Sequence, residues 1–223
     1  MKDLLSNIKI IINSNIYIKD PESSDLGRRI VGNSIILIDE VGFEDFTFKK
    51  LGKKIGSNES SIYRYFESKH KLLIYLTSWY WAWVEYQMVF ETNNILDKKE
   101  KLRKSIEIIT RTTTEDSKYL HIDEVRLNRI MINENSKSFL TKEVDQENKE
   151  GYFMIYKRLV NRIQLIISEA NPHYIFAGSL ASSIVEGALH QHFLKDHFPS
   201  LTDCKEGKTP TDFFMDMVFK VTQ

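Results

Sequence analysis

The sequence predicts an all-α protein, and three observations support that fold class. Apolar residues make up 42% of the 223-residue chain and aromatic residues 12%, which is enough to fill a sizeable core. Along most of the chain the apolar residues recur at helical spacing. Only four prolines and nine glycines are present, so there is little material for a turn-rich β architecture. We therefore expect two helical parts, a small N-terminal head and a larger bundle after it.

The head is expected to follow an N-terminal arm, residues 1–26, which contains the loop 20–25. Thr47 is a good N-cap and Gly56 a good helix end, while Asn58 and Ser68 can cap the next two helices. Gly42 stands where a left-handed C-cap would end the first helix. These signals predict four helices, over residues 26–42, 47–56, 58–66 and 68–91.

The second part is read from periodicity and from one clear break. Asn171-Pro172 is the firmest boundary, because proline starts helices well and continues them badly. Pro199 and Pro210 bracket a loop that holds Cys204. The expected helices lie near residues 98–114, 122–136, 139–170, 173–195 and 210–221.

Charge is balanced over the whole chain but not locally. Lysine plus arginine and aspartate plus glutamate number 31 each. Between Thr47 and Lys71 there are seven basic and two acidic residues, so this segment carries +5 and the remainder −5. A basic segment on an acidic body favours a polyanion-binding face, with a solvated helix surface as the alternative.

Cysteine content and hydropathy point to a compartment. The single cysteine, Cys204, excludes an internal disulfide framework and favours a reducing environment. The N-terminus alternates apolar and polar residues without a small-residue cleavage site, which argues against a signal peptide. The longest apolar run, Trp79 to Val84, is far shorter than the ~20 residues of a membrane span. We expect a cytoplasmic protein.

Two short helices separated by Gly56-Ser57-Asn58 form a candidate helix-turn-helix. Over residues 28–73 the order and spacing of a longer string resemble the DNA-binding domain of the tetracycline-repressor (TetR) family. That string is Gly42-Phe43, Phe46-Thr47, Leu51-Gly52, Gly56, Ile62-Tyr63-Arg64-Tyr65-Phe66, Ser68-Lys69 and Leu72-Leu73. The resemblance implies a DNA-binding domain over 27–68 and a ligand-binding and dimerisation domain over 69–223.

Two positions depart from the family pattern. Gly52 stands where alanine is usual, which costs ~1 kcal/mol of helix propensity but permits a closer helix crossing. Ser57 stands where an apolar residue is usual, which removes a hydrophobic staple to the next helix. Neither position is a DNA-contacting group, so the predicted function stands.

The resemblance also assigns roles at the DNA. The third helix would lie in the major groove with Glu59, Ser60, Ser61 and Tyr65 on its exposed face, although Glu59 could simply favour the helix N-terminus. Phosphate contacts are expected from four other residues. For the tyrosine among them, the alternative is a half-buried core aromatic. Those residues are Thr47, Lys49, Tyr63 and Lys69.

In this family the last two long helices form a homodimer, and here they would be 173–195 and 210–221. The first carries small residues that let helices approach closely, and the second carries bulky apolar ones. Packing of the same faces within one chain is the alternative. The candidate interface residues are Ala177, Ala181, Ala188, Phe213, Phe214 and Met217.

A small-molecule effector is implied, of apolar or aromatic character, since such pockets are mostly apolar. Its candidate pocket residues are Trp79, Trp83, Phe153 and Tyr156, which could equally be ordinary core. No cofactor is expected. His190 and His192 are two apart and would point to different helix faces, so we do not expect them to share a metal with His197.

The sequence thus predicts a ligand-responsive repressor that binds a palindromic operator in double-stranded DNA as a homodimer. No nucleophile–base constellation can be read from residue spacing, so catalysis has no positive support. Two alternatives remain. One is a helical ligand carrier or enzyme with a vestigial helix-turn-helix. The other is an interaction module that presents its basic head to an acidic protein.

Overall fold

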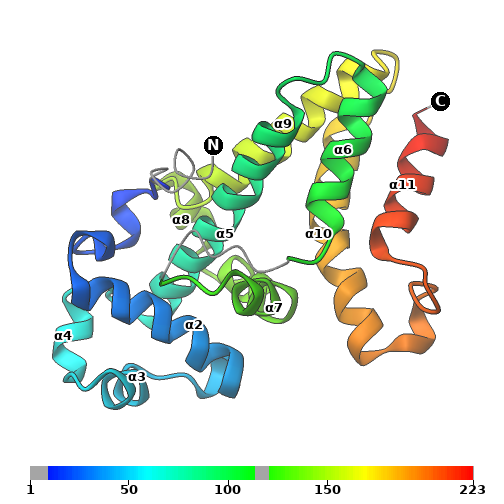
Figure 1. Ribbon diagram of the computed structural model, residues 1–223. Helices are drawn as coiled ribbons and strands as arrows, with labels where there is room; N and C mark the ends of the chain where they lie inside the picture. Colours follow the sequence, from blue (N-terminus) through cyan, green and yellow to red (C-terminus); the bar gives the residue numbers. More distant parts are fainter. Residues whose placement is uncertain (1–9, 114–120, 223) are drawn as a thin grey trace. The chain divides into compact units, whose positions relative to one another are not determined.

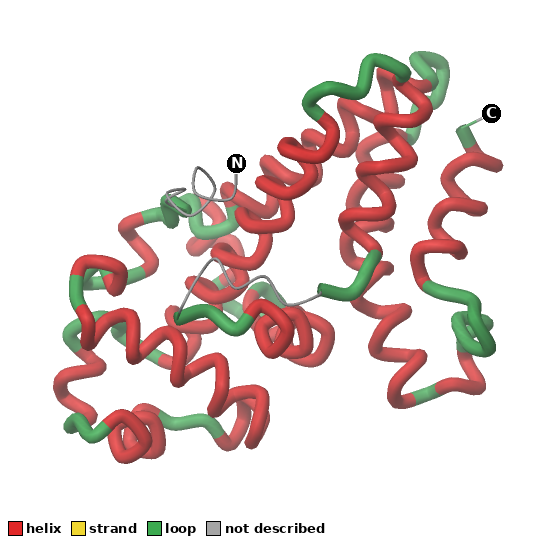
Figure 2. Tube along the Cα trace, viewed as in Figure 1, coloured by secondary structure: helices red, strands yellow, loops and turns green. Residues whose placement is uncertain are grey.

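The computed structural model describes residues 10–113 and 121–222, and every regular element among them is helical (Figures 1 and 2). The all-α prediction is therefore confirmed for the described chain. Short 3-10 helices precede the first long helix, at Ser14–Ile16 (η1) and Pro21–Ser23 (η2). The α-helices are α2 (Asp25–Asp45), α3 (Phe48–Ile55), α4 (Glu59–Tyr63), α5 (Lys69–Thr92), α6 (Lys98–Thr110), α7 (Glu124–Glu134), α8 (Val144–Lys149), α9 (Met154–Ala170), α10 (Ala177–His197) and α11 (Pro210–Val221).

The prediction of one helix over 139–170 is wrong in its first half. Residues 144–149 form the separate short helix α8, and α9 begins only at Met154. Gly151 lies between them with a φ of +82°, a conformation that suits glycine and ends a helix. Gly42 acts in the same way inside α2, with φ +77°, so only one short turn follows the end predicted for that helix.

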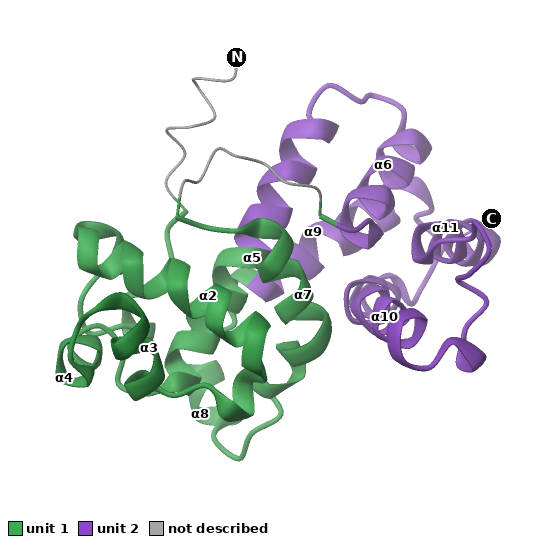
Figure 3. Ribbon diagram, turned by 60° about the horizontal axis from the view of Figure 1, so that its bottom comes forward, with its two compact units in different colours: residues 1–80, 113–155 green, residues 81–112, 156–223 purple. Residues whose placement is uncertain are grey.

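The chain forms two compact units, coloured separately in Figure 3. Unit 1 contains residues 1–80 and 113–155, and unit 2 contains residues 81–112 and 156–223. Helices α5 and α9 therefore contribute to both units. Unit 1 adds α7, α8 and the start of α5 to the head segment that the sequence defined as 27–68.

In unit 1, helix α7 packs along α2 through apolar and charged contacts. Leu127 and Met131 of α7 are fully buried. Asp39 of α2 is nearly buried and accepts two hydrogen bonds from Arg129, at 2.8 and 2.6 Å, and a third from Arg126 at 3.1 Å. The paired geometry of the Arg129 guanidinium holds the two helices at a defined register.

Unit 2 is built from α6, α10 and α11 with parts of α5 and α9. A Cβ added to Gly187 of α10 would lie 2.8 Å from the ring of Phe214, so α11 packs directly on that glycine. Glu85 of α5 is buried, and Arg158 and Arg162 of α9 donate hydrogen bonds to its carboxylate at 2.8–3.1 Å. A buried carboxylate requires such partners, and here they tie α5 to α9.

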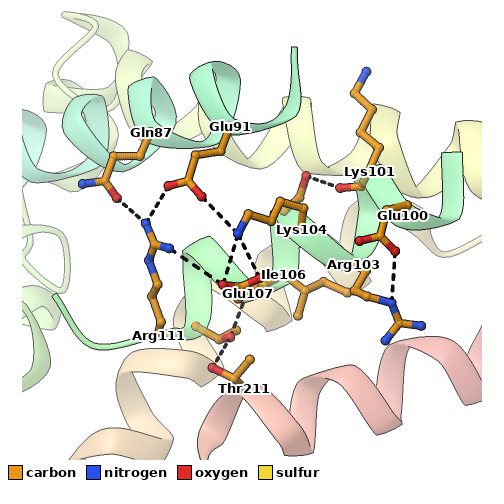
Figure 4. A network of polar contacts seen from close by, with 12 residues as sticks. Gln87, Glu91, Glu100, Lys101, Arg103, Lys104, Ile106, Glu107, Arg111 and Thr211 are labelled. Carbon is orange, nitrogen blue, oxygen red and sulfur yellow. Dashed lines mark hydrogen bonds and ion pairs between the residues drawn. The ribbon is translucent and has the colours of Figure 1, made fainter. Parts of the chain in front are cut away.

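A second charged network joins α5 to α6 within unit 2 (Figure 4). Glu91 accepts a hydrogen bond from Arg111 at 2.8 Å and lies 3.1 Å from the Lys104 ammonium. Glu107 faces both cations, at 3.1 Å from Lys104 and 3.9 Å from Arg111. Acids and bases therefore alternate around a ring of four charges, and each charge has two opposite neighbours.

The ring of charges lowers the pKa of Glu91. Burial favours the neutral form of Glu91, but the hydrogen bonds and charges of Arg111 and Lys104 outweigh it and lower the pKa of Glu91 below 4.5. A lowered folded-state pKa stabilises the fold above the unfolded-state value. That contribution disappears as the pH falls through the folded-state pKa.

We predict that Glu91→Gln lowers the free energy of unfolding by about 1 kcal/mol at pH 7. The difference from wild type should shrink as the pH falls through the lowered pKa of Glu91, because protonated Glu91 also lacks the charge. Urea denaturation at several pH values measures this, with the more exposed Glu100→Gln as the matched control. A constant difference at all pH values would contradict the role of the charge.

Candidate nucleic-acid interface

The local sequence explains both helices of the helix-turn-helix and the turn between them. Thr47 caps α3 by accepting a hydrogen bond from the Lys50 N–H at 3.2 Å. Gly56 ends α3 in the left-handed conformation, with φ +64°. Asn58 caps α4, where its Oδ1 accepts from the Ser61 N–H at 2.8 Å. All three signals were read from sequence and are confirmed.

Gly52 permits the close crossing that its sequence position suggested. A Cβ at this position would lie 2.8 Å from the Ser57 carbonyl oxygen and 3.4 Å from the Glu59 nitrogen. The Gly52 carbonyl also accepts a hydrogen bond from the Ser57 N–H at 2.9 Å. The turn therefore folds directly onto α3, and a larger residue would push it away.

The outer surface of the head is basic. Lys49 and Lys53 of α3 are exposed and make no ion pair or hydrogen bond within the described chain. Their neighbours are engaged: Lys50 donates to the Asp45 carbonyl at 2.7 Å, and Lys54 pairs with Glu40 at 2.9 Å. Two of the four lysines of α3 are thus uncommitted cations on the surface of the head.

Tyr63, at the end of α4, has the arrangement expected of a phosphate ligand. Its side chain is 46% exposed, and its ring lies edge-on to buried Phe48 with 5.0 Å between the centroids. The ring is therefore positioned by the core while the side chain reaches solvent. The alternative, a half-buried core aromatic, accounts for the position of the Tyr63 ring. It does not account for the nearly half of the residue that is exposed.

Tyr65 does not lie on the exposed face, so this part of the prediction is wrong. The residue is only 4% exposed, and its hydroxyl is hydrogen-bonded to the Ser24 hydroxyl at 2.7 Å. The Lys19 ammonium lies over its ring, 5.1 Å from the centroid. The bond to Ser24, with Lys19 and Arg64 nearby, lowers the pKa of the Tyr65 phenol against the opposing effect of burial. Tyr65 anchors the arm rather than reading bases.

The serines of α4 differ from each other. Ser60 is exposed, whereas Ser61 is partly covered and its hydroxyl donates to Asn58 Oδ1 at 2.6 Å. Glu59 lies in the first turn of α4, where its charge favours the helix N-terminus. Ser60 thus has its hydroxyl available at the surface, while Ser61 retains only acceptor lone pairs.

Lys69 has a structural role that sequence reasoning missed. Its ammonium donates to the Phe43 and Glu44 carbonyls at 3.0 and 2.9 Å, and so caps the end of α2. The Phe43 N–H donates to Glu134 Oε1 at 3.0 Å, which fixes the same turn from α7. Two of the three Lys69 donors are used in this way, and the ammonium also lies 4.8 Å from the centroid of the Phe43 ring.

Sequence comparison assigns the head. The sequence model described as bacterial regulatory proteins, tetR family, matches residues 31–76. These residues run from the first half of α2 through the helix-turn-helix into α5. The head of the chain therefore has the sequence pattern of a tetR-family DNA-binding domain. No curated protein sequence matches the chain.

Solved structures share the fold of this chain beyond the matched head. The chain is similar to AibR, solved in complex with isovaleryl coenzyme A and operator DNA, at 18% identity over 87% of this chain and 98% of AibR, TM-score 0.57. It is similar to the fatty acid degradation regulator FadR from Bacillus halodurans, at 16% identity over 87% and 93% of the two chains, TM-score 0.60. The superantigen PfiT is also similar, at 17% identity over 92% and 99%, TM-score 0.60. Because such different proteins share the fold, these likenesses establish the fold alone.

The effector-pocket candidates do not form one cluster in either unit. Trp79 and Phe153 belong to unit 1, while Trp83 and Tyr156 belong to unit 2. Both tryptophans are buried. Tyr156 lies 5.9 Å from the Trp81 ring, and its hydroxyl is hydrogen-bonded to Glu186, whose pKa burial raises. The sequence analysis did not identify Glu186 as a partner of Tyr156, because a lone glutamate on a helix gives no sequence signal.

The dimer candidates separate into two groups. Ala177, Ala181, Ala188 and Phe214 are buried within unit 2, so they support the alternative of intramolecular packing and cannot meet a second chain. Phe213 is 45% exposed and Met217 is partly exposed. With Val221, also exposed, these two form a stripe on α11 at a spacing of four residues.

Among the described residues, no group of three or more His, Cys, Asp or Glu side chains could hold a metal ion. His192 is buried, and its Nε2 donates a hydrogen bond to the Thr110 carbonyl at 2.8 Å. This ring nitrogen is therefore engaged in a structural hydrogen bond. Within the described chain, no helix has the length and hydropathy needed to cross a membrane.

We predict that Gly52→Ala lowers the free energy of unfolding by about 1 kcal/mol. The overlap with the Ser57 carbonyl outweighs the gain in helix propensity. Urea denaturation measures the change, and the exposed Lys53→Ala on the same helix should be nearly neutral. A Gly52→Ala variant more stable than wild type would show that the turn shifts without cost.

Proposed function

We propose that this tetR-family protein is a ligand-responsive repressor that binds a palindromic operator as a homodimer. The observation that carries the proposal is the outward face of α4, with exposed Ser60 and Tyr63, beside the uncommitted cations Lys49 and Lys53. A short helix flanked by cations and backed by its own core fits the major groove of a duplex. Access to genomic DNA implies the cytoplasm.

Each exposed group has a role in this proposal. Helix α4 enters the major groove, where the Ser60 hydroxyl meets base edges. The Tyr63 hydroxyl and the Lys49 ammonium bind phosphates on the groove walls. The Thr47 oxygen already accepts from α3, so its O–H is free to donate to a phosphate. The third donor of the Lys69 ammonium would bind a further phosphate. These phosphate contacts supply affinity and register, and α4 supplies sequence preference.

A dimer follows from the apolar stripe on α11. Phe213, Met217 and Val221 lie four residues apart and are left partly or largely exposed by the packing of unit 2. Two copies joined through this stripe would bury it and would give one molecule two α4 helices. The two half-sites would then be spaced by roughly 34–36 Å, one turn of the duplex.

An effector would bind in the helical bundle and shift the protein towards a conformation of lower operator affinity. The size of the shift is limited by the difference in effector affinity between the two conformations. AibR, which shares the fold, was solved with an acyl-coenzyme A, and this supports an effector with an apolar portion. Aromatic side chains such as Trp83 and Tyr156 offer suitable contacts if the bundle opens.

A carrier or enzyme with a vestigial head, or a module for acidic proteins, would not discriminate among DNA sequences. An electrophoretic shift assay with genomic fragments from around its own gene separates these alternatives. The repressor should retard some fragments at salt concentrations where others run free. Retardation of none, even at low salt, would contradict the proposed function.

Lys49→Ala should weaken binding to all DNA and reduce the slope of log affinity against log salt by about one. The reason is that one fewer phosphate counterion is released on binding. Fluorescence anisotropy over a salt series measures the slope, and Lys98→Ala on α6 of unit 2 should leave it unchanged. An unaltered slope for Lys49→Ala would remove this lysine from the DNA interface.

Phe213→Asp should convert the dimer to monomers, because a charge in an apolar interface is strongly unfavourable. Sedimentation equilibrium should give twice the 26.2 kDa chain mass for wild type and the single mass for the variant. Leu96→Asp, at an almost fully exposed position between α5 and α6, is the matched control and should remain dimeric. A wild-type monomer at all concentrations would contradict the dimer.

A further inference from the structure

Arg64 follows the last residue of α4 and extends its outer face. Its backbone stays in the right-handed helical region, with φ −71° and ψ −18°. Residues four apart in a helical backbone lie on the same face, so Arg64 lies beside Ser60. Both side chains are exposed, whereas Ile62 between them is completely buried. The outer face of α4 therefore ends in an arginine.

The residues that follow prevent this face from turning inward. Tyr65 is bound through its hydroxyl to Ser24, and its carbonyl accepts a hydrogen bond from the Ile18 N–H at 2.8 Å. Phe66 is completely buried in the same head. Successive side chains on a helical backbone point about 100° apart. Holding Tyr65 and Phe66 inward therefore holds Arg64 outward.

The Arg64 guanidinium makes no hydrogen bond or ion pair within the described chain. The acidic residues nearest to it in sequence, Glu59 and Glu67, do not pair with it. Arginine is the only side chain with five donors in a planar fork, and here the fork is uncommitted. The other arginines of the head, Arg28 and Arg29, donate to the Glu22 and Ile55 carbonyls.

We propose that Arg64 reads a guanine in each operator half-site. This inference rests on the proposed function and specifies its sequence preference. A guanidinium fork matches the O6 and N7 acceptors of guanine in the major groove. On the α4 face Ser60 is short and Ser61 is engaged with Asn58, so Arg64 supplies both the length and the paired donors. Tyr65 holds the backbone from which Arg64 extends and is a positioning residue.

Selection of bound sites from a random DNA pool tests this assignment. Wild-type protein should enrich a guanine at one symmetric position in each half-site. Arg64→Ala should lose that preference and bind the wild-type operator roughly 10- to 100-fold more weakly per half-site. Arg64→Gln should shift the preference at the same position towards adenine, which glutamine reads.

A matched variant separates base reading from phosphate binding. Lys53→Ala removes an exposed cation from α3 and should weaken all sequences alike, with the enriched guanine retained. If Arg64→Ala also weakens all sequences alike, Arg64 contacts phosphate and the assignment fails. Unchanged binding would overturn it equally. Because Arg64 is exposed, its variants should keep the wild-type thermal midpoint, which circular dichroism verifies.

The proposed function and this inference fail in distinguishable ways. Wild-type protein that enriches no sequence at all would overturn the operator-binding function itself, and the inference with it. A wild-type site that the protein enriches, but that contains no guanine sensitive to Arg64, would leave the repressor standing and overturn only the role of this residue.

Discussion

The outward position of a five-residue helix depends on what holds its two ends. α4 is too short to be stable alone, since isolated helices need far more than one turn. Asn58 fixes its start through the Ser61 N–H, and Tyr65 fixes its end through Ser24. Between these anchors the single buried residue Ile62 faces the core, and the polar residues have only the outer side left. The surface proposed to face DNA is therefore a consequence of these anchors.

The arm and α7 also hold other parts of the head in place. The arm approaches α2 so closely that a Cβ on Gly27 would clash with the Pro21 carbonyl oxygen. On the other side, Glu134 and Lys69 fix the turn that leads from α2 into α3. The arm and Glu134 thus support the helix-turn-helix from outside the 46 residues that carry the family signature, and Lys69 supports it from within them. Glu134 of α7 thus holds the backbone turn that precedes α3.

Local chemistry made most of the head predictable from sequence. Thr47, Gly56 and Asn58 act on backbone groups within four residues, so the signal and its effect lie in the same short segment. Tyr65 was mistaken because its partner, Ser24, lies 41 residues earlier, and nothing in the spacing announces that contact. The structural role of Lys69 was not predicted for the same reason, because the Phe43 and Glu44 carbonyls that it binds lie 26 and 25 residues earlier. The break at Gly151 was missed because the apolar period on either side remains helical.

Chemical footprinting of the bound operator tests the central claim most directly. Dimethyl sulfate methylates guanine N7 in the major groove and adenine N3 in the minor groove, so it reports which groove is filled. With α4 presented as described, bound protein should protect guanine N7 in two patches about one duplex turn apart and leave adenine N3 reactive. Protection of adenine N3 alone, or no defined patches on DNA that the protein retards, would contradict the account.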